Sequence, residues 1–239
     1  MFGCPTARAP GRWWSVGALA FSISGLAAFS AAAESSPSRG GAIFAARPGA
    51  LFYARVYRSS AGVLSSLSHD HVIRAGAFTA SIRFDPSAPE RCSATLQIPV
   101  KSLMVDEPSM RQRVGLSTPL DASDRKTVRQ HMLAEDQLDA EHHPEIQVLL
   151  AGCVESATRG SYHADVTFTI RGKTARRERA ARITLSGSQL SARGSLRLSH
   201  AAFGIRPYSA WLGSVGNAEP IDFAWALQAD QVAESPPKP

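Results

Sequence analysis

Short segments in which apolar and polar residues alternate recur along most of the chain. Side chains of a strand point to opposite faces in turn, so this alternation predicts strands that bury one face. Turn residues separate the segments. They are 51–57, 76–85, 92–100, 145–154, 162–170, 179–187, 189–198 and 219–227. Many short strands and little else predict an antiparallel all-β domain.

The alternation also predicts which residues face the interior. The shared apolar faces are Phe78, Ile82 and Phe84; Leu96, Ile98 and Val100; Val166, Phe168 and Ile170; and Ile221, Phe223 and Trp225. One apolar face per strand suits a sandwich or a barrel. A barrel of about eight strands can be filled by its own side chains or can hold one small ligand.

One segment, residues 123–133, has a helical pattern instead. Ser123 can cap a helix, Asp124 suits its positive end, and Val128 and Met132 lie four residues apart on one face. We expect a short amphipathic helix inserted between two strands over one end of the barrel. It can serve simply as a plug that keeps water from the core.

Residues 1–33 have the layout of a secretory signal peptide. Arg8 and Arg12 precede an apolar run, residues 16–29, and the segment ends in small residues. The run is shorter than the roughly 20 residues of a spanning helix. We expect cleavage near Ala33 and a periplasmic or secreted protein.

Composition sets the remaining boundaries and limits the class of partner. Residues 34–50 are expected to be a flexible segment, 51–228 the barrel and 229–239 a disordered tail. Without residues 1–33, Lys and Arg fall from 26 to 24 against 20 acidic residues, so the net charge falls from +6 to +4. This mild, dispersed charge does not indicate a nucleic-acid-binding protein.

Two cysteines, Cys92 and Cys153, remain in the exported chain, where disulfides can persist. Segments 92–100 and 145–154 are expected to pair as neighbouring antiparallel strands. If their apolar residues face the same interior, the two cysteines point to opposite faces. We therefore expect no disulfide, unless a bulge near Gly152 shifts the register.

His69, Asp70 and His71 form the most chemically suggestive local cluster. In an extended chain the two histidines share one face, and Asp70 can hold one imidazole tautomer. The histidines can contact a ligand head group or form a structural cluster. They can also bind a metal if His200 or His131 supplies a third ligand. No G-x-S-x-G sequence and no nucleophile accompany them, so we expect no enzyme activity.

Two further segments have alternative interpretations. Residues 171–182 hold six basic residues and one acidic residue. These charges either protect a strand edge or attract anionic lipid head groups or a pyrophosphate. In residues 203–217, Tyr208, Trp211 and Leu212 form either a satellite core or a lid.

Five motifs in order resemble the YceI family of lipocalin-like, polyisoprenoid-binding barrels. They are Phe84-Asp85; Lys101-Ser102-Leu103; Leu138 with His143 to Ile146; Ile170-Arg171-Gly172-Lys173-Thr174; and Phe203-Gly204-Ile205. The resemblance covers residues 51–228. It implies an antiparallel β-barrel of about eight strands with a short helical insertion. It also implies a periplasmic carrier of a long isoprenoid chain, either an isoprenoid quinone or a polyprenyl lipid.

The expected ligand is thus an isoprenoid-type lipid, with transient membrane contact and no cofactor; the oligomeric state is left open. The candidate ligand-binding residues are His69, His71, Phe78, Ile82, Phe84, Leu96, Ile98, Val148, Val166, Phe168, Ile170, Leu198, Phe203, Trp211 and Phe223. A rival interpretation is a metal-binding protein or small metalloenzyme using His69, His71 and His200. A third is a structural module whose barrel is filled by its own side chains.

Overall fold

The computed structural model describes residues 41–61, 68–210 and 214–233. The expected signal peptide, residues 1–33, lies outside these ranges, as do Trp211 and Leu212. None of the helices within them is both long and apolar enough to cross a membrane.

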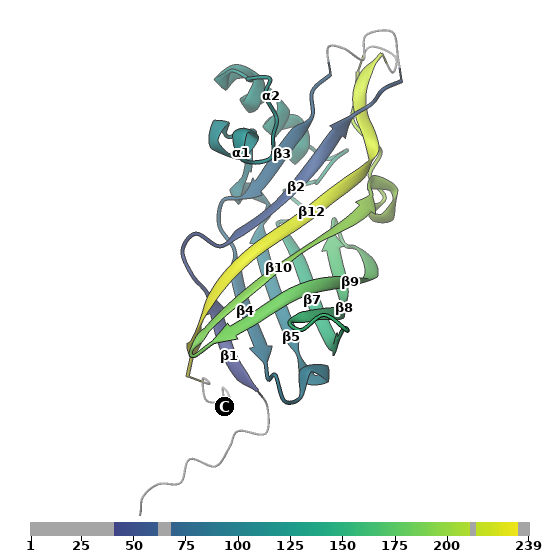
Figure 1. The fold of residues 1–239 in the computed structure, drawn as a ribbon. Coiled ribbons are helices and arrows are strands. Elements are labelled where there is room, and N and C mark those ends of the chain that lie inside the picture. Colours follow the sequence, from purple (N-terminus) through teal and green to yellow (C-terminus); the bar gives the residue numbers. More distant parts are fainter. Residues whose placement is uncertain (1–40, 62–67, 211–213, 234–239) are drawn as a thin grey trace, which may run out of the picture. The chain divides into compact units, whose positions relative to one another are not determined.

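Eight lengths of the described chain form a closed antiparallel β-barrel, as predicted (Figure 1). Three of these eight barrel segments are each interrupted and consist of two consecutive strands. The three pairs are β1 (Ala42–Ala46) with β2 (Leu51–Arg58), β3 (His71–Ala75) with β4 (Thr79–Phe84), and β5 (Ser93–Pro99) with β6 (Leu103–Val105). The continuous strands are β7 (Glu145–Glu155), β8 (Ser161–Ile170), β9 (Lys173–Ser186), β10 (Gln189–Ser199) and β12 (Val215–Val232). A two-residue strand, β11 (Ser209–Ala210), pairs with β12.

Strand β12 closes the barrel. One of its edges pairs with β10 over the full length of β10. Its other edge pairs first with β2, where Trp225 lies opposite Phe52, and then with β1, where Val232 lies opposite Ile43. All neighbouring strands are antiparallel, so the chain winds up and down around the barrel.

The strand breaks divide the barrel into an upper half, walled by β2, β3 and β6, and a lower half, walled by β1, β4 and β5 (Figure 1). At one break the amide of Gly76 donates to the carbonyl oxygen of Ser102 at 3.0 Å. A Cβ on Gly76 would lie 2.3 Å from that oxygen, so the approach requires glycine.

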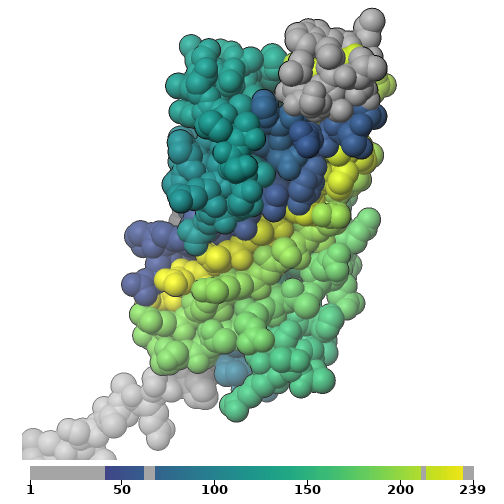
Figure 2. All heavy atoms as spheres, turned by 45° about the horizontal axis from the view of Figure 1, so that its top comes forward, coloured from purple at the N-terminus to yellow at the C-terminus, as the bar shows by residue number. Residues whose placement is uncertain are grey.

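Two helices lie between β6 and β7: α1 (Pro108–Arg113) and α2 (Ala122–Leu133). Helix α2 confirms the predicted helix. Its cap is Asp121 rather than Ser123, because the Asp121 side chain accepts from the amide of Asp124 at 2.8 Å. Figure 2 shows the segment that carries both helices lying over the upper half of the barrel. The described residues also include three 3-10 helices: η2 (Pro89–Arg91), η3 (Val100–Ser102) and η4 (His200–Phe203).

Both boundaries predicted for the barrel were too narrow. Strand β1 lies inside the segment expected to be flexible, residues 34–50, and β12 continues four residues past 228, to Val232. The two extensions pair with each other, and β1 also pairs with β4. Phe44 of β1 is completely buried. A strand of five residues with a single fully buried side chain gives too weak a sequence pattern to recognise alone.

The prediction that Cys92 and Cys153 remain unpaired is wrong. They form a disulfide, with Cα atoms 5.6 Å apart. The two strands pair with their apolar residues on one face, as predicted, since Ile98 lies opposite Ile146. However, a bulge follows Ala151, where Gly152 adopts a φ of +67°. The bulge turns Cys153 into the interior, where it is completely buried.

Candidate functional site

An apolar cavity of about 180 Å³ lies in the upper half of the barrel. The inward faces of the strands form the wall of the cavity. The cover of the cavity consists of α2, the loop after α2, and η4. The lining residues are Phe52, Ala54, Val56, His71, Ile73, Ala75, Ile98, Leu103, Val128, His131, Met132, Gln137, Leu138, Ile146, Ile170, His200, Phe203, Ile205, Tyr208, Asn217, Ile221 and Phe223. The cavity is therefore apolar in its body and carries a small set of polar groups.

Three aromatic rings form the floor of the cavity. The ring centroids of Phe168 and Phe223 are 4.6 Å apart, and that of Phe52 lies 6.0 Å and 6.4 Å from them. Phe168 is completely buried beneath the other two, which line the cavity. These rings separate the cavity from the lower half of the barrel.

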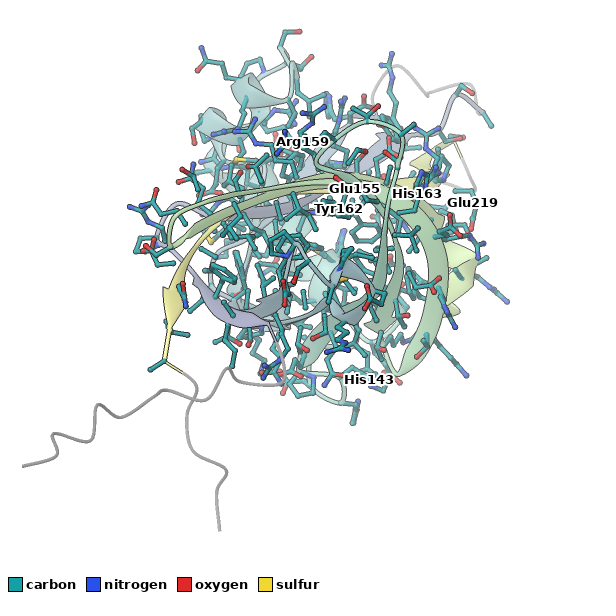
Figure 3. All side chains as sticks on the ribbon, turned by 60° about the horizontal axis from the view of Figure 1, so that its bottom comes forward. His143, Glu155, Arg159, Tyr162, His163 and Glu219 are labelled. Carbon is teal, nitrogen blue, oxygen red and sulfur yellow. A yellow bond between two sulfur atoms is a disulfide. The ribbon has the colours of Figure 1, made fainter. Side chains whose placement is uncertain are left out.

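The lower half is filled by side chains. Tyr162 lies in the barrel interior near the end of the lower half, next to the hairpin that carries Glu155 and Arg159 (Figure 3). Its ring meets Phe84 edge-on at a centroid distance of 5.4 Å. Burial, reinforced by the nearby Glu155 carboxylate, raises the pKa of the Tyr162 hydroxyl. The interpretation of a barrel filled by its own side chains thus describes this half.

Hydrogen bonds fasten the cover of the cavity to the barrel. Arg129 of α2 donates to the carbonyl oxygens of Leu103 at 3.1 Å and Lys101 at 2.6 Å. On the other side, Arg171 donates to the carbonyl oxygen of Glu135 at 2.8 Å. Val128 and Met132 face the cavity from α2, as their spacing predicted.

A buried polar network supports one edge of the cavity. Nδ1 of His71 lies 2.6 Å from Oδ2 of Asp106, whose other oxygen accepts from the amide of Val72 at 3.0 Å and from Arg111 at 2.7 Å. Arg111 also donates to the carbonyl oxygens of Asp70 and Thr118. Asp106 is completely buried and has a φ of +50°. The network holds His71 in place against the cavity.

The Asp106 carboxyl is held in its charged form. Burial acts to raise its pKa, but the hydrogen bonds from His71, Val72 and Arg111 outweigh burial and lower the pKa. An ionised carboxylate has no proton to give. The proton between it and His71 therefore belongs to the imidazole.

A second histidine, His200, reaches the cavity from η4. Its Nδ1 lies 2.8 Å from the carbonyl oxygen of Glu219, and 5% of the residue is exposed. At the mouth, the exposed ring of His131 stacks on Tyr208 with centroids 4.9 Å apart. Tyr208 therefore belongs to the cavity boundary.

Five of the predicted ligand-binding residues line the cavity: His71, Ile98, Ile170, Phe203 and Phe223. Seven others are buried but do not line it: Ile82, Phe84, Leu96, Val148, Val166, Phe168 and Leu198. Phe78 is half-buried before β4 and outside the cavity, and Trp211 lies outside the described residues. Alternation identifies the inward face of a strand but not which part of that face remains open.

The His-Asp-His cluster differs from its prediction. Strand β3 starts at His71, so His69 and Asp70 precede it, and His69 does not line the cavity. Asp70 accepts from the amide of Arg58 at 2.9 Å and does not orient an imidazole. That role belongs to Asp106, which no local sequence signal connects with His71. No three histidine, cysteine or acidic side chains in the described ranges lie close enough together to hold a metal, so His69, His71 and His200 do not form a ligand set.

The remaining lining residues were not among the predicted ligand-binding residues. Ala54 and Val56 alternate with Phe52 on β2, and this pattern was available in the sequence. The contributions of the loops, such as Gln137, carry no comparable signal. Their position depends on how the loops fold over the barrel end.

A closed barrel with an apolar cavity that opens at a mouth is an architecture that can hold a small apolar molecule. Residues 58–227 match the profile of the YceI-like domain, so the chain belongs to the YceI-like family. No curated protein matches the sequence.

Solved structures share this fold at low sequence identity. Burkholderia cenocepacia BcnA has a TM-score of 0.55 and 16% identity, covering 75% of this chain and 96% of its own. A polyisoprenoid-binding domain from Saccharophagus degradans, implicated in plant cell wall breakdown, has a TM-score of 0.52 and 10% identity, covering 80% and 99%. Campylobacter jejuni YceI protein has a TM-score of 0.51 and 13% identity, covering 67% and 85%.

Proposed function

We propose that this protein binds an isoprenoid-type lipid, with the apolar chain in the cavity and the polar end near its histidines. The observation that carries the proposal is the apolar cavity between the aromatic floor and α2. Family membership and the similarity to a polyisoprenoid-binding domain support the choice of ligand. The proposed role is binding without a chemical step.

The size of the cavity limits how a long chain can fit. Each CH₂ group removed from water contributes about 0.8 kcal/mol, so even a short buried length binds appreciably. The volume of about 180 Å³ is below the roughly 300–1,000 Å³ of typical small-molecule sites. A long isoprenoid must therefore extend through the mouth or displace side chains such as Met132.

We further propose that the protein carries or sequesters this lipid in the periplasm or outside the cell. The leader-like pattern of residues 1–33 supports export. An apolar chain exposed to water is unfavourable, so a protein that encloses it can move it between membranes. Such a carrier needs a surface that meets a membrane.

The open edge of β9 supplies a candidate for that surface. Strand β9 pairs with β10 only from Ala181 to Ser186, so residues 173–180 have no second neighbouring strand in the described chain. Arg177 and Arg179 lie on the inward-facing register of β9, yet both are exposed. This stretch of β9 therefore has a strand edge that no described strand pairs with.

Five cations near this edge form no ion pair with any described residue; we call them the basic edge. They are Lys173, Arg177, Arg179, Arg182 and Arg193. Arg182 lies directly opposite Arg193, a like-charge pair that disfavours the sheet. An anionic membrane surface relieves this repulsion and attracts all five. We propose that the basic edge contacts the membrane.

Lipid extraction tests the binding proposal. The purified protein is extracted with organic solvent, the extract is analysed by mass spectrometry, and a fluorescent polyprenyl analogue is titrated into the delipidated protein. We expect an isoprenoid lipid and saturable binding. An extract without lipid, together with no saturable binding, would refute the proposal.

A cavity-filling variant locates the ligand. Ala54→Phe places a ring in the cavity and is expected to weaken binding of the analogue at least tenfold. Ala224→Phe, on the outer face of the neighbouring strand β12, is the matched control and is expected to bind normally. Circular dichroism verifies that both variants fold. Normal binding by folded Ala54→Phe would place the ligand elsewhere.

A further inference from the structure

Three histidines line the cavity, and two of them, His71 and His200, have Nδ1 engaged by the protein. The Asp106 carboxylate can only accept, so Nδ1 of His71 donates to it at 2.6 Å. The carbonyl oxygen of Glu219 also only accepts, so Nδ1 of His200 donates to it at 2.8 Å. In each neutral ring the proton is thereby fixed on Nδ1, and Nε2 carries a lone pair.

Neither Nε2 atom has a hydrogen-bond partner among the described residues. His200 is almost completely buried, and both rings line an otherwise apolar cavity. An acceptor in such surroundings is unfavourable until a donor reaches it. The described protein offers none, so the donor is water or, once a ligand displaces water from the cavity, the ligand itself.

The other polar side chains at the cavity do not discriminate between donors and acceptors. The hydroxyl of Tyr208 and the amide of Asn217 can act as either. The amide nitrogen of Gln137 donates to the carbonyl oxygen of Arg206 at 3.2 Å. His131, whose exposed ring stacks on Tyr208, has no ring hydrogen bond to a described residue that would fix its tautomer. The imidazoles of His71 and His200, with their protons fixed by the protein, are therefore the groups that set the preference.

We propose that the cavity selects isoprenoids whose polar end donates a hydrogen bond, an alcohol or a hydroquinone, over those that only accept, an aldehyde or a quinone. This inference rests on the proposed binding of an isoprenoid. A hydroxyl donates to Nε2 of His200 or His71, whereas a carbonyl oxygen placed there meets another lone pair.

An isosteric pair of ligands tests the preference. Geraniol and geranial have the same carbon skeleton, but geraniol ends in a hydroxyl and geranial in an aldehyde. None of the described lining residues is a lysine that could react with the aldehyde. Each competes with the fluorescent polyprenyl analogue on delipidated protein near neutral pH. We expect geraniol to bind about fivefold or more tightly than geranial.

Asparagine substitutions assign the preference to the imidazoles. His200→Asn and His71→Asn keep an N–H close to the position of Nδ1 and remove Nε2. We expect the double variant to bind the two ligands equally. Thermal unfolding checks that it remains folded.

Each other outcome has a distinct meaning. Equal binding of both ligands, or tighter binding of geranial, overturns the inference and leaves lipid binding intact. A preference that persists in the folded double variant also overturns it, because other groups then carry the selection. Failure of both ligands and of the analogue to bind overturns the proposed function together with the inference.

Discussion

Nδ1 of His71 lies 2.6 Å from Oδ2 of Asp106, and this contact joins β3 to the turn before α1. Arg111 donates to the same buried carboxylate, so Asp106 also compensates the charge of the buried Arg111 guanidinium. The contact therefore links the stability of the upper half of the barrel to the orientation of a cavity histidine. It leads to the first prediction.

Asp106→Asn is expected to destabilise the protein by about 3–5 kcal/mol, because it leaves the buried guanidinium of Arg111 without a counter-charge. Urea unfolding at neutral pH measures the change. Asp121→Asn, which alters an exposed helix cap, is the control, and its effect is expected to be small. A loss below about 1 kcal/mol for Asp106→Asn would contradict the role assigned to this carboxylate.

The same carboxylate contributes to acid sensitivity. The pKa of Asp106 is lower in the folded protein than the ordinary value of about 3.9. Its contribution to stability is therefore present above about pH 4 and is lost as the pH falls through the folded-state pKa. Urea unfolding of wild type and Asp106→Asn between neutral and acidic pH should show the difference between them shrinking in acid. A difference that stays constant would contradict this linkage.

The disulfide between Cys92 and Cys153 predicts that neither residue reacts with a thiol reagent under denaturing, non-reducing conditions. Replacing both by serine is expected to lower the free energy of unfolding by about 2–5 kcal/mol, because the bond restricts the unfolded chain. Wild-type protein measured with reductant provides the comparison. Two reactive thiols in the untreated protein would show that the bond is absent in solution.

Arg129 is expected to control access to the cavity. Arg129→Ala removes both hydrogen bonds from α2 to the barrel rim, so the ligand should dissociate several-fold faster with little change in overall fold. Lys126→Ala, at an exposed position of the same helix, is the control. Stopped-flow displacement of the fluorescent analogue measures the rates. Equal dissociation rates would show that α2 does not gate the cavity.

The basic edge is tested by charge reversal. Arg177→Glu with Arg179→Glu is expected to weaken binding to vesicles containing anionic lipid more than tenfold, and high salt should weaken the wild type similarly. Arg113→Glu with Lys126→Glu, in the helical segment, makes the same change in net charge as a control. Vesicle sedimentation measures both. Equal effects of the two pairs would mean that only net charge matters.

Much of the barrel is determined by local features of the sequence. Alternation on β5 and β7 was enough to place Ile98 and Ile146 on the same interior face, because each strand must turn its apolar face to the same interior. Four-residue spacing likewise placed Val128 and Met132 on the cavity side of α2. Such patterns reflect the period of a single element and need no knowledge of its neighbours.

Tertiary structure decided which part of the interior stays open. Phe168 and Ile170 point to the same face of the same strand. However, Phe168 is completely buried within the aromatic floor, whereas Ile170 lines the cavity. The difference depends on the combined volume of side chains from several strands at each level of the barrel. No single strand carries that information.

Contacts between distant segments were also beyond the sequence. The bulge at Gly152 reversed the expected direction of Cys153, since one extra residue turns a side chain to the other face. Asp106, 35 positions from His71, took the role expected of the adjacent Asp70. Local periodicity thus determines the strands and their faces, whereas the disulfide, the imidazole tautomers and the cavity depend on how those faces meet.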